Sequence, residues 1–371
     1  FYRPYQTRNE KDGDDDIDDV QQLLEKECQD TLLFCYQSKF MRDIMAKYGG
    51  YVACMDATNK TTDYALLLSL VVVKTPCGYV TVGVFIVQFE TQTCISEALS
   101  VLRKWCPNFQ PQYWMADYCH AEINALHETF PESKVVLCDF HREQAWDRWM
   151  RKEENCVQAK EVLLHLLRKI ANSTSEEELQ QSNEDLQSSA VWLQNVRLQH
   201  YITTQWLAVK EMWARSHRLE HDILLTVEAQ NKVVKEFYLK SSHGRKSLTG
   251  LISVLVQKFL PERKNNYQKE DMRLSSSYRK YSSEVPEYLH NRPPTFIKHV
   301  MTRMCATADL TLHDIKALPS PGTFSVRSQG KEGDYHVDYG APSCTCADFV
   351  RVKCPCKHFC AIFQLVDGLM A

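Results

Sequence analysis

The first half of the chain alternates between short apolar runs and segments with helical spacing. Three apolar or β-branched runs come first, at residues 51–56, 65–74 and 79–89. Pro76-Cys77-Gly78 predicts a hairpin turn between the second and third runs. Two strand-then-helix units follow a helix at 94–105, with strands at 113–117 and 135–138 and helices at 121–129 and 141–150. This order predicts a mixed sheet covered by helices, in the α/β class.

The remaining segments are mostly helical in pattern. A helix is expected within residues 20–47, which Gly49-Gly50 would end. Residues 157–238 predict almost only helices, and Trp192, Trp206 and Trp213 are interpreted as their packing core. A further apolar helix is expected at 251–260. The last sixty residues predict short strands and turns around a cysteine cluster.

Composition narrows the class of protein. Of 371 residues, 44% are hydrophobic and 25% charged, which excludes a mainly disordered chain, a coiled coil and a collagen-like fibre. The longest apolar run, residues 65–73, is far shorter than the ~20 residues that a membrane helix needs. No secretory signal pattern opens the sequence. The fifteen cysteines are an odd number and mostly lie in apolar stretches, which favours an intracellular, reducing compartment over a disulfide scaffold.

The net charge of −3 hides two opposite segments. Residues 10–19 hold seven acids and one lysine, a net of −6. Residues 240–303 hold 13 Lys and Arg against 5 Asp and Glu, a net of +8. These segments are interpreted as a solvated linker and a solvated helical face, or, for the basic one with its interleaved tyrosines, as a nucleic-acid contact.

A Cys/His cluster lies near the C-terminus. Cys344 and Cys346 form a Cys-x-Cys pair, and nine residues later Cys356 and His358 form a Cys-x-His pair. Two close pairs of thiolate and imidazole ligands are what tetrahedral Zn²⁺ requires, and four protein ligands predict a closed structural site. Cys354 is an alternative third ligand because it precedes Cys356 by two residues.

Two acidic residues end predicted strands. Asp56 closes the run 51–56, and Asp117 closes the run 113–117. Carboxylates at the ends of neighbouring strands can hold two Mg²⁺ or Mn²⁺ ions for phosphodiester chemistry. The alternative interpretation is that both are ordinary turn residues.

The cysteine spacing, Cys-x-Cys-x9-Cys-x-His, resembles the SWIM zinc finger, and Phe349, Phe359 and Ile362 around it agree with that resemblance. Such fingers imply contact with DNA or protein. Lys353 and Lys357 flank the ligands and are candidates to meet phosphate.

The sheet segments resemble the core of Mutator-like element transposases. The resemblance is carried by Asp56-Ala57-Thr58-Asn59-Lys60-Thr61, by Ala116-Asp117, by Val136-Leu137-Cys138-Asp139-Phe140-His141 and by Thr226-Val227-Glu228-Ala229-Gln230-Asn231-Lys232. It implies a ribonuclease-H-like fold with a long helical insertion, and an Asp-Asp-Glu triad at Asp56, Asp117 and Glu228. Cys138 and His141 match the family's Cys-x-x-His signature, and they are interpreted either as packing residues at a strand end and a helix start or as residues with a metal or end-processing role.

The two resemblances together divide the chain into five segments. They are an acidic N-terminal segment and helix at 1–48, a ribonuclease-H-like core at 49–150, a helical insertion at 151–225, the rest of the core with a basic helical segment at 226–310, and a SWIM-type finger at 320–371. The combination resembles the SWIM-domain-containing zinc-finger proteins of animals, which are similar to transposases that no longer move.

Three hypotheses follow for function. The first is a nuclear zinc-binding protein that acts as a DNA- or protein-binding module without turnover. The second is an active two-metal nuclease or transposase that uses the acidic triad. The third is an adaptor that docks protein partners through the helical insertion. None of them calls for a membrane or a small-molecule cofactor.

Overall fold

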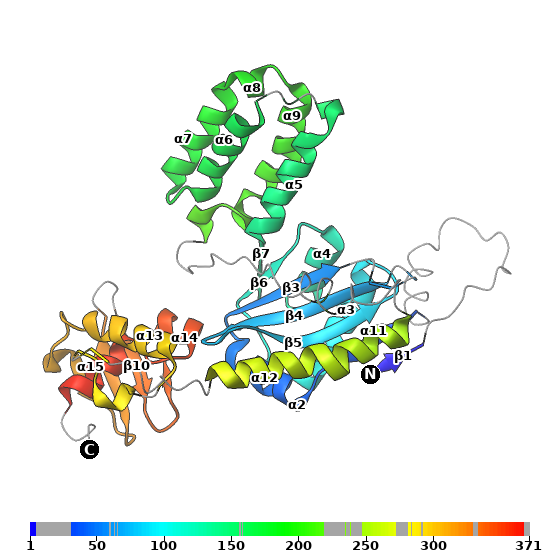
Figure 1. Cartoon of the computed structure of the whole chain (residues 1–371). Helices are drawn as coiled ribbons and strands as arrows, with labels where there is room; N and C mark the ends of the chain where they lie inside the picture. The colour runs from blue at the N-terminus through cyan, green and yellow to red at the C-terminus, as the bar shows by residue number, and fades with distance from the viewer. Residues whose placement is uncertain are drawn as a thin grey trace.

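The structure is a computed structural model. It describes residues 1–4, 31–58, 61–62, 64, 66–155, 157, 159–218, 234, 238, 247–271, 281–282, 284–290, 292–328 and 333–366. A seven-stranded mixed sheet forms the centre, in the order β1-β2-β5-β4-β3-β6-β7 (Figure 1). Its strands are β1 (Tyr2–Arg3), β2 (Leu33–Tyr36), β3 (Val52–Thr58), β4 (Leu67–Thr75), β5 (Gly78–Val87), β6 (Tyr113–Ala116) and β7 (Lys134–Leu137).

The sheet joins an antiparallel half to a parallel half. β3, β4 and β5 pair antiparallel, and the hairpin predicted at residues 76–78 is present, with Thr75 opposite Gly78. Gly78 has a φ of 104°, a backbone conformation that favours glycine. β6 pairs parallel with both β3 and β7, so β3, β6 and β7 all end at the same edge of the sheet.

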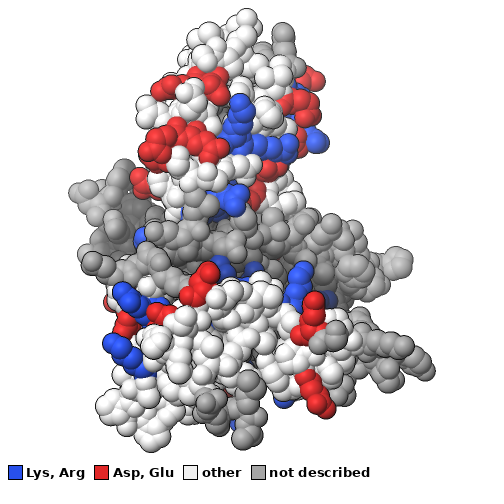
Figure 2. Space-filling model, turned by 90° about the vertical axis from the view of Figure 1, so that its left-hand side faces the viewer, with Lys and Arg blue, Asp and Glu red and all other residues white. Residues whose placement is uncertain are grey.

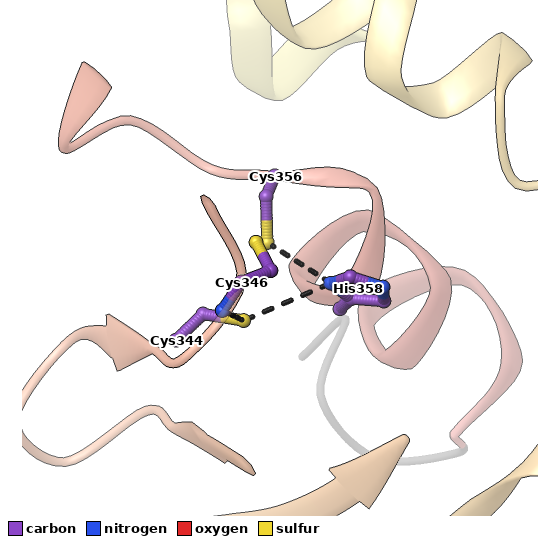
Figure 3. Close-up of side chains that lie close together, drawn as sticks. All are labelled: Cys344, Cys346, Cys356 and His358. Atoms are coloured by element: carbon purple, nitrogen blue, oxygen red, sulfur yellow. Dashed lines mark hydrogen bonds between the residues drawn. The ribbon is translucent and has the colours of Figure 1, made fainter. Parts of the chain in front are cut away.

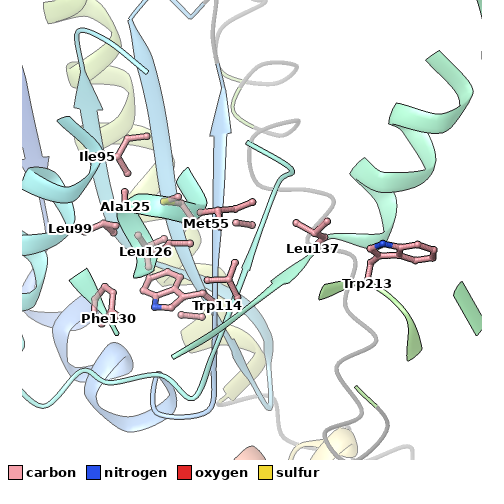
Figure 4. Close-up of a cluster of buried hydrophobic side chains, with 14 of the residues drawn as sticks. Met55, Ile95, Leu99, Trp114, Ala125, Leu126, Phe130, Leu137 and Trp213 are labelled. Carbon is pink, nitrogen blue, oxygen red and sulfur yellow. The ribbon is translucent and has the colours of Figure 1, made fainter. Parts of the chain in front are cut away.

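Helices cover both faces of the sheet. One face packs against α2 (Lys39–Tyr48), α3 (Gln92–Trp105) and α4 (His120–Thr129), and Figure 4 shows the core between them around Trp114 and Leu126. The other face packs against a long helical segment, which begins as α11 (Leu248–Val254), passes through a π-helical turn at Leu255–Phe259 and ends as α12 (Leu260–Asp271). The mixed sheet with helices on both sides confirms the expected α/β class.

The helix expected within residues 20–47 is partly wrong. Residues 20–30 lie outside the described part of the chain, but Leu33–Tyr36 is strand β2 and pairs with β5. Leucine, phenylalanine and tyrosine fit either element, and the partner strand decides between them. The helix α2 begins only after Ser38, whose side chain accepts a hydrogen bond from the Met41 backbone amide.

A separate helical layer follows β7. It contains α5 (Asp139–Arg151), α6 (Lys160–Asn172), α7 (Glu176–Ser188), α8 (Ala190–Leu193) and α9 (Val196–Tyr201), followed by short π and 3₁₀ turns at Ile202–Trp206, Leu207–Met212 and Arg215–His217. In Figure 1 this layer stands beyond the β6–β7 end of the sheet. Trp206 and Trp213 are buried there and pack edge-to-face on Trp146, as the sequence predicted for a helical core.

The C-terminal part forms a small module of its own. Its four-stranded sheet has the order β11-β10-β9-β8, from β8 (Ile315–Ala317), β9 (Thr323–Arg327), β10 (Asp334–Asp338) and β11 (Ser343–Cys344). The helices are α13 (Pro294–Cys305), α14 (Ala347–Val352) and α15 (Lys357–Leu365), with 3₁₀ turns at Glu287–Leu289 before α13 and at Leu312–Asp314 before β8. A further 3₁₀ turn, Glu153–Asn155, follows α5. Among the described helices, none has the length and apolar character needed to cross a membrane.

The core around α4 gives the first prediction. Leu126 is fully buried between α4 and the sheet, so Leu126→Ala should lower the free energy of unfolding by about 2–5 kcal/mol through lost contacts and a cavity. Leu193→Ala is the matched control, because that side chain is 65% exposed, and it should change stability by less than about 0.5 kcal/mol. Chemical denaturation measures both, and equal effects would contradict the described packing.

Candidate metal centre and the edge of the central sheet

The four predicted zinc ligands come together in the C-terminal module. Cys344 ends β11, Cys346 caps α14, Cys356 caps α15 and His358 lies in the first turn of α15. Their ligand atoms all lie within 4.8 Å of one another, and each residue is at most 4% exposed. Figure 3 shows the three sulfurs and the imidazole converging from the strand end and the two helix starts.

The spacing of these atoms fits a tetrahedral zinc ion. Nδ1 of His358 lies 3.7 Å from Sγ of Cys344 and 3.7 Å from Sγ of Cys356. Zinc bonds of about 2.3 Å to sulfur and about 2.0–2.1 Å to nitrogen, at tetrahedral angles, place these atoms roughly 3.6 Å apart. The described geometry therefore needs little movement to close around an ion.

The pKa values of the three thiols are shifted in different directions. Hydrogen bonds with Cys344 and Cys356 lower the pKa of Cys346. The pKa of Cys344 is raised to about 12, because its thiol donates to Cys346, and the pKa of Cys356 is raised for the same reason. Cys346 also accepts from the backbone amide of Phe349 at the start of α14, where a negative charge is favourable.

Aromatic side chains enclose the cluster. Phe349 stacks on Phe359 with ring centroids 5.3 Å apart, and Tyr335 lies over the His358 ring at 4.4 Å. The Tyr339 hydroxyl donates to the carbonyl of Phe359 at 2.6 Å. These contacts fix α15 against β10 and exclude water from the ligands.

The alternative ligand, Cys354, lies apart from the cluster. Its thiol is buried, and burial raises its pKa to about 11. It lines a cavity of about 570 Å³ together with Lys47, Tyr48 and Phe296, at the contact between the module and the central sheet. The geometry therefore selects Cys356 as the third member of the cluster.

An ion pair joins two helices of the module, α13 and α14. Arg303 on α13 donates two hydrogen bonds to the carboxylate of Asp348 on α14, at 2.7 and 2.8 Å. Burial raises the pKa of Asp348, but the hydrogen bonds and charge of Arg303 outweigh it, and the pKa is lowered. His299 on the same helix contacts the carbonyl of Pro355, one residue before Cys356.

The predicted acids Asp56 and Asp117 reach the same edge of the central sheet. Cys54 of β3 lies opposite Met115 of β6, and each acid follows two residues later. Cys54 and Met115 pack against the α11–α12 face, and the alternation of side chains places both acids on that face. Glu228, the third predicted acid, lies outside the described residues.

The structure also brings Cys138 and His141 to Asp117. The ligand atoms of these three residues lie within 4.8 Å of one another, and Nδ1 of His141 pairs with Oδ1 of Asp117. Burial lowers the pKa of His141, but its hydrogen bonds to Asp117 and Cys138 outweigh that effect and raise the pKa to about 10. The imidazole therefore carries a positive charge at neutral pH.

Glu122 on α4 is an acid of this region that sequence reasoning missed. It is 2% exposed, and its Oε2 atom is buried with no hydrogen-bond partner among the described residues. Burial raises its pKa well above the usual value, and the charges of Asp117, Glu90 and Asp56 raise it further. One signal was present in the sequence, because Glu122 interrupts the apolar face of the helix predicted at 121–129.

Two basic side chains in the described part of the basic segment contact aromatic rings of the same chain. The guanidinium of Arg263 lies over the Phe259 ring at 5.6 Å, and the ammonium of Lys264 lies over Phe40 at 5.8 Å. Figure 2 shows one face of the molecule, on which the described Lys and Arg side chains are interspersed with Asp and Glu. Arg273, Tyr278, Arg279 and Lys280 lie outside the described residues.

A known family model matches the part of the chain that contains most of the central sheet. Residues 14–136 match the family model described as "Zinc finger SWIM domain-containing protein 1/3, RNaseH-like domain". The match includes Asp56 and Asp117 and ends before the Cys/His cluster. No curated protein matches the chain. The match supports a SWIM-domain protein family with an RNaseH-like domain, and the buried cluster of three cysteines and one histidine is compatible with a zinc finger.

The Arg303–Asp348 pair gives the second prediction. Arg303→Ala should lower the free energy of unfolding by about 1 kcal/mol at neutral pH, since the pair is partly exposed. The pKa of Asp348 is lower in the folded protein than in the unfolded chain, where it is about 3.9. The pair therefore adds to the free energy of unfolding above that pH, and this contribution is lost as the pH falls through the pKa of Asp348 in the folded protein. Denaturation of both proteins at a series of pH values should therefore show a difference that shrinks below about pH 4.

Lys298→Ala on the exposed side of α13 is the control and should have little effect at any pH. A difference between wild type and Arg303→Ala that is the same at pH 7 and pH 3 would mean that Asp348 is not its partner.

Proposed function

We propose that this chain is a zinc-binding protein with a SWIM-type finger, derived from a Mutator-like transposase. It acts in the nucleus as a DNA- or protein-binding module without turnover. The observation that carries the proposal is the closed, buried cluster of Cys344, Cys346, Cys356 and His358. A buried site with four protein ligands leaves no open position for a substrate, which is typical of structural zinc.

Zinc would supply folding free energy to the C-terminal module, as it does in other small metal-bound domains. The chain's own residues prepare the site. The ends of β11, α14 and α15 set the positions of the four ligands, and the Phe349–Phe359 stack covers them. Folding of the module and binding of the ion are therefore expected to be one event.

The absence of turnover is supported by the state of the acids at the sheet edge. Asp117 is paired with the charged His141, and the raised pKa of Glu122 favours its neutral form. Two-metal chemistry needs several ionised carboxylates that are free to coordinate. Of the described acids, Asp117 is instead paired with His141, and the neutral form of Glu122 is favoured.

One observation favours the second candidate, an active two-metal nuclease. Asp56 and Asp117 stand on the same face at the ends of adjacent parallel strands, the arrangement that two divalent ions need. That candidate also requires a third acid, which the transposase resemblance assigns to Glu228.

The proposed partner contact lies beside the finger's ligands. Lys353 ends α14 in a left-handed conformation with a φ of 54°, and its ammonium lies 5.8 Å from the centre of the Phe349 ring. Lys357 lies between the ligands Cys356 and His358. Two lysines next to the buried ligands are suited to contact DNA phosphates.

The third prediction concerns the finger. Cys356→Ser should remove one equivalent of tightly bound zinc and unfold the C-terminal module, because it takes one thiolate from the closed site. Cys360→Ser is the matched control, since Cys360 is also buried on α15 but lies outside the cluster. Elemental analysis with limited proteolysis measures both effects. Equal zinc content in the two variants would contradict the proposed site.

The fourth prediction concerns DNA. The zinc-loaded chain should bind duplex DNA with an affinity that falls as salt rises. Lys353→Gln with Lys357→Gln should reduce the slope of log affinity against log salt by about 2, one for each lost phosphate contact. Fluorescence anisotropy over a salt series measures the slope.

The matched control removes two exposed lysines on other elements, by Lys104→Gln with Lys134→Gln, and it should leave the slope unchanged. A slope near zero in the wild type would remove DNA as the partner. Cleavage of the duplex with Mn²⁺, lost in Asp117→Asn, would replace the proposal with the nuclease candidate.

A further inference from the structure

Three side chains of different ligand chemistry converge where β6 and β7 end. Asp117 offers a carboxylate, Cys138 a thiol and His141 an imidazole, with ligand atoms within 4.8 Å of one another. We propose that they form a second metal site, which binds a zinc-type divalent cation and keeps one coordination position open. This site is separate from the finger and goes beyond the proposed function.

The backbone holds the three residues in place. Ala116 of β6 lies opposite Leu137 of β7, so Asp117 and Cys138 follow at the same level of the sheet. The amide of Cys138 donates to the carbonyl of Ala116 at 3.0 Å. Cys138 then caps α5, and its carbonyl accepts from the amide of Arg142 at 3.0 Å. His141 follows three residues later, close to one helical turn, which returns its side chain to the side of Cys138.

The helix that carries His141 is fixed from its other side. Arg142 places its guanidinium over the rings of Trp146 and Trp213, and it donates to Asp139 and to the Trp213 carbonyl. Arg218 donates to Asp139 as well. Arg218 also donates to the carbonyl of Leu137 in β7. These contacts hold the start of α5 rigidly against the rest of the helical layer and against β7, and a rigid support favours a metal site.

The set of donor atoms selects the type of metal. Thiolate and imidazole ligands suit zinc and other borderline or soft ions, whereas Mg²⁺ prefers oxygen ligands. Zinc accepts cysteine, histidine and aspartate together, and three protein ligands leave a fourth position for water or a substrate atom. Asp117 and His141 already contact each other through Oδ1 and Nδ1, and a metal ion would take the place of the proton between them.

One of the three ligands is buried and the other two are partly exposed, which suits a site that an ion can reach from solvent. Cys138 is 4% exposed and packs in the apolar cluster with Met115 and Val136. The side chains of Asp117 and His141 are 29% and 25% exposed, which gives an ion a path from solvent. In the finger, all four ligands are closed off.

A neighbouring buried acid gives independent support for a cation. Glu122 is 2% exposed, and its Oε2 atom has no hydrogen-bond partner among the described residues. Its carboxyl group interacts electrostatically with both Asp117 and His141. A buried carboxyl oxygen without a hydrogen-bond partner costs free energy, which a nearby divalent cation offsets. Glu90 and Cys119 lie next to Glu122 and form a second, more acidic group.

The fifth prediction is the zinc content of the full chain. After chelation and reloading with Zn²⁺, elemental analysis should find two equivalents in the wild type, one for each site. Cys138→Ser and His141→Gln should each retain one equivalent, because the loss of a ligand weakens binding by more than the roughly 10–100-fold typical of an outer hydrogen-bond partner. Circular dichroism and thermal unfolding establish that each variant is folded.

Cys119→Ser and His127→Gln are the matched controls, and both should keep two equivalents. Cys119 belongs to the neighbouring acidic group, and His127 is exposed on α4. One equivalent in the wild type would overturn the proposal. A loss in Cys119→Ser that Cys138→Ser does not share would also overturn it, by moving the site to the neighbouring group.

The finger variant separates this inference from the proposed function and does not depend on the folding of the core variants. Cys356→Ser should keep one equivalent, held at Asp117, Cys138 and His141. If Cys356→Ser bound no zinc, the second site would be contradicted, but the proposed zinc site of the finger would not. Two equivalents in Cys356→Ser would contradict the finger instead.

Discussion

The strand β6 pairs parallel with both β3 and β7, and this pairing positions the polar groups at the edge of the central sheet. The three strands therefore end together at one edge of the sheet. Because side chains alternate between the two faces, a residue two positions after a buried one lies on the same face. Asp56, Asp117 and Cys138 follow the buried residues Cys54, Met115 and Val136 in this way, so all three lie on one face. A shift of one residue would turn these groups to the opposite face, against α3 and α4. The buried residues of both faces therefore fix the chemistry at this edge.

The two proposed metal sites obey different physical rules. In the finger, the ligands come from a strand end and two helix starts of one short segment, so the ion and the fold depend on each other. At the sheet edge, the hydrophobic cores on both faces of the central sheet already fix the positions of the ligands. A metal would therefore bind to a site that is formed before the ion arrives. The first arrangement suits a structural role, and the second suits a site that can exchange its ion.

Short-range patterns in the sequence were enough for part of this structure. The Cys-x-Cys and Cys-x-His pairs predicted the finger cluster, because both pairs lie within fifteen residues of chain. The hairpin at Gly78 and the strands β3 to β7 followed from local patterns as well. Leu33–Tyr36 did not, since its strand form depends on pairing with β5, about fifty residues away. The sequence did not single out Glu122, because elements that are distant along the chain bury it and bring the other acids close to it.

An anomalous-scattering map of the zinc-loaded crystal, collected on both sides of the zinc absorption edge, would locate an ion among Cys344, Cys346, Cys356 and His358. If these four residues enclose one zinc ion, the map has a peak about 2.3 Å from the three sulfurs and about 2.0–2.1 Å from Nδ1 of His358. A map with no peak there, or with Cys354 bonded to the ion in place of Cys356, would contradict that arrangement.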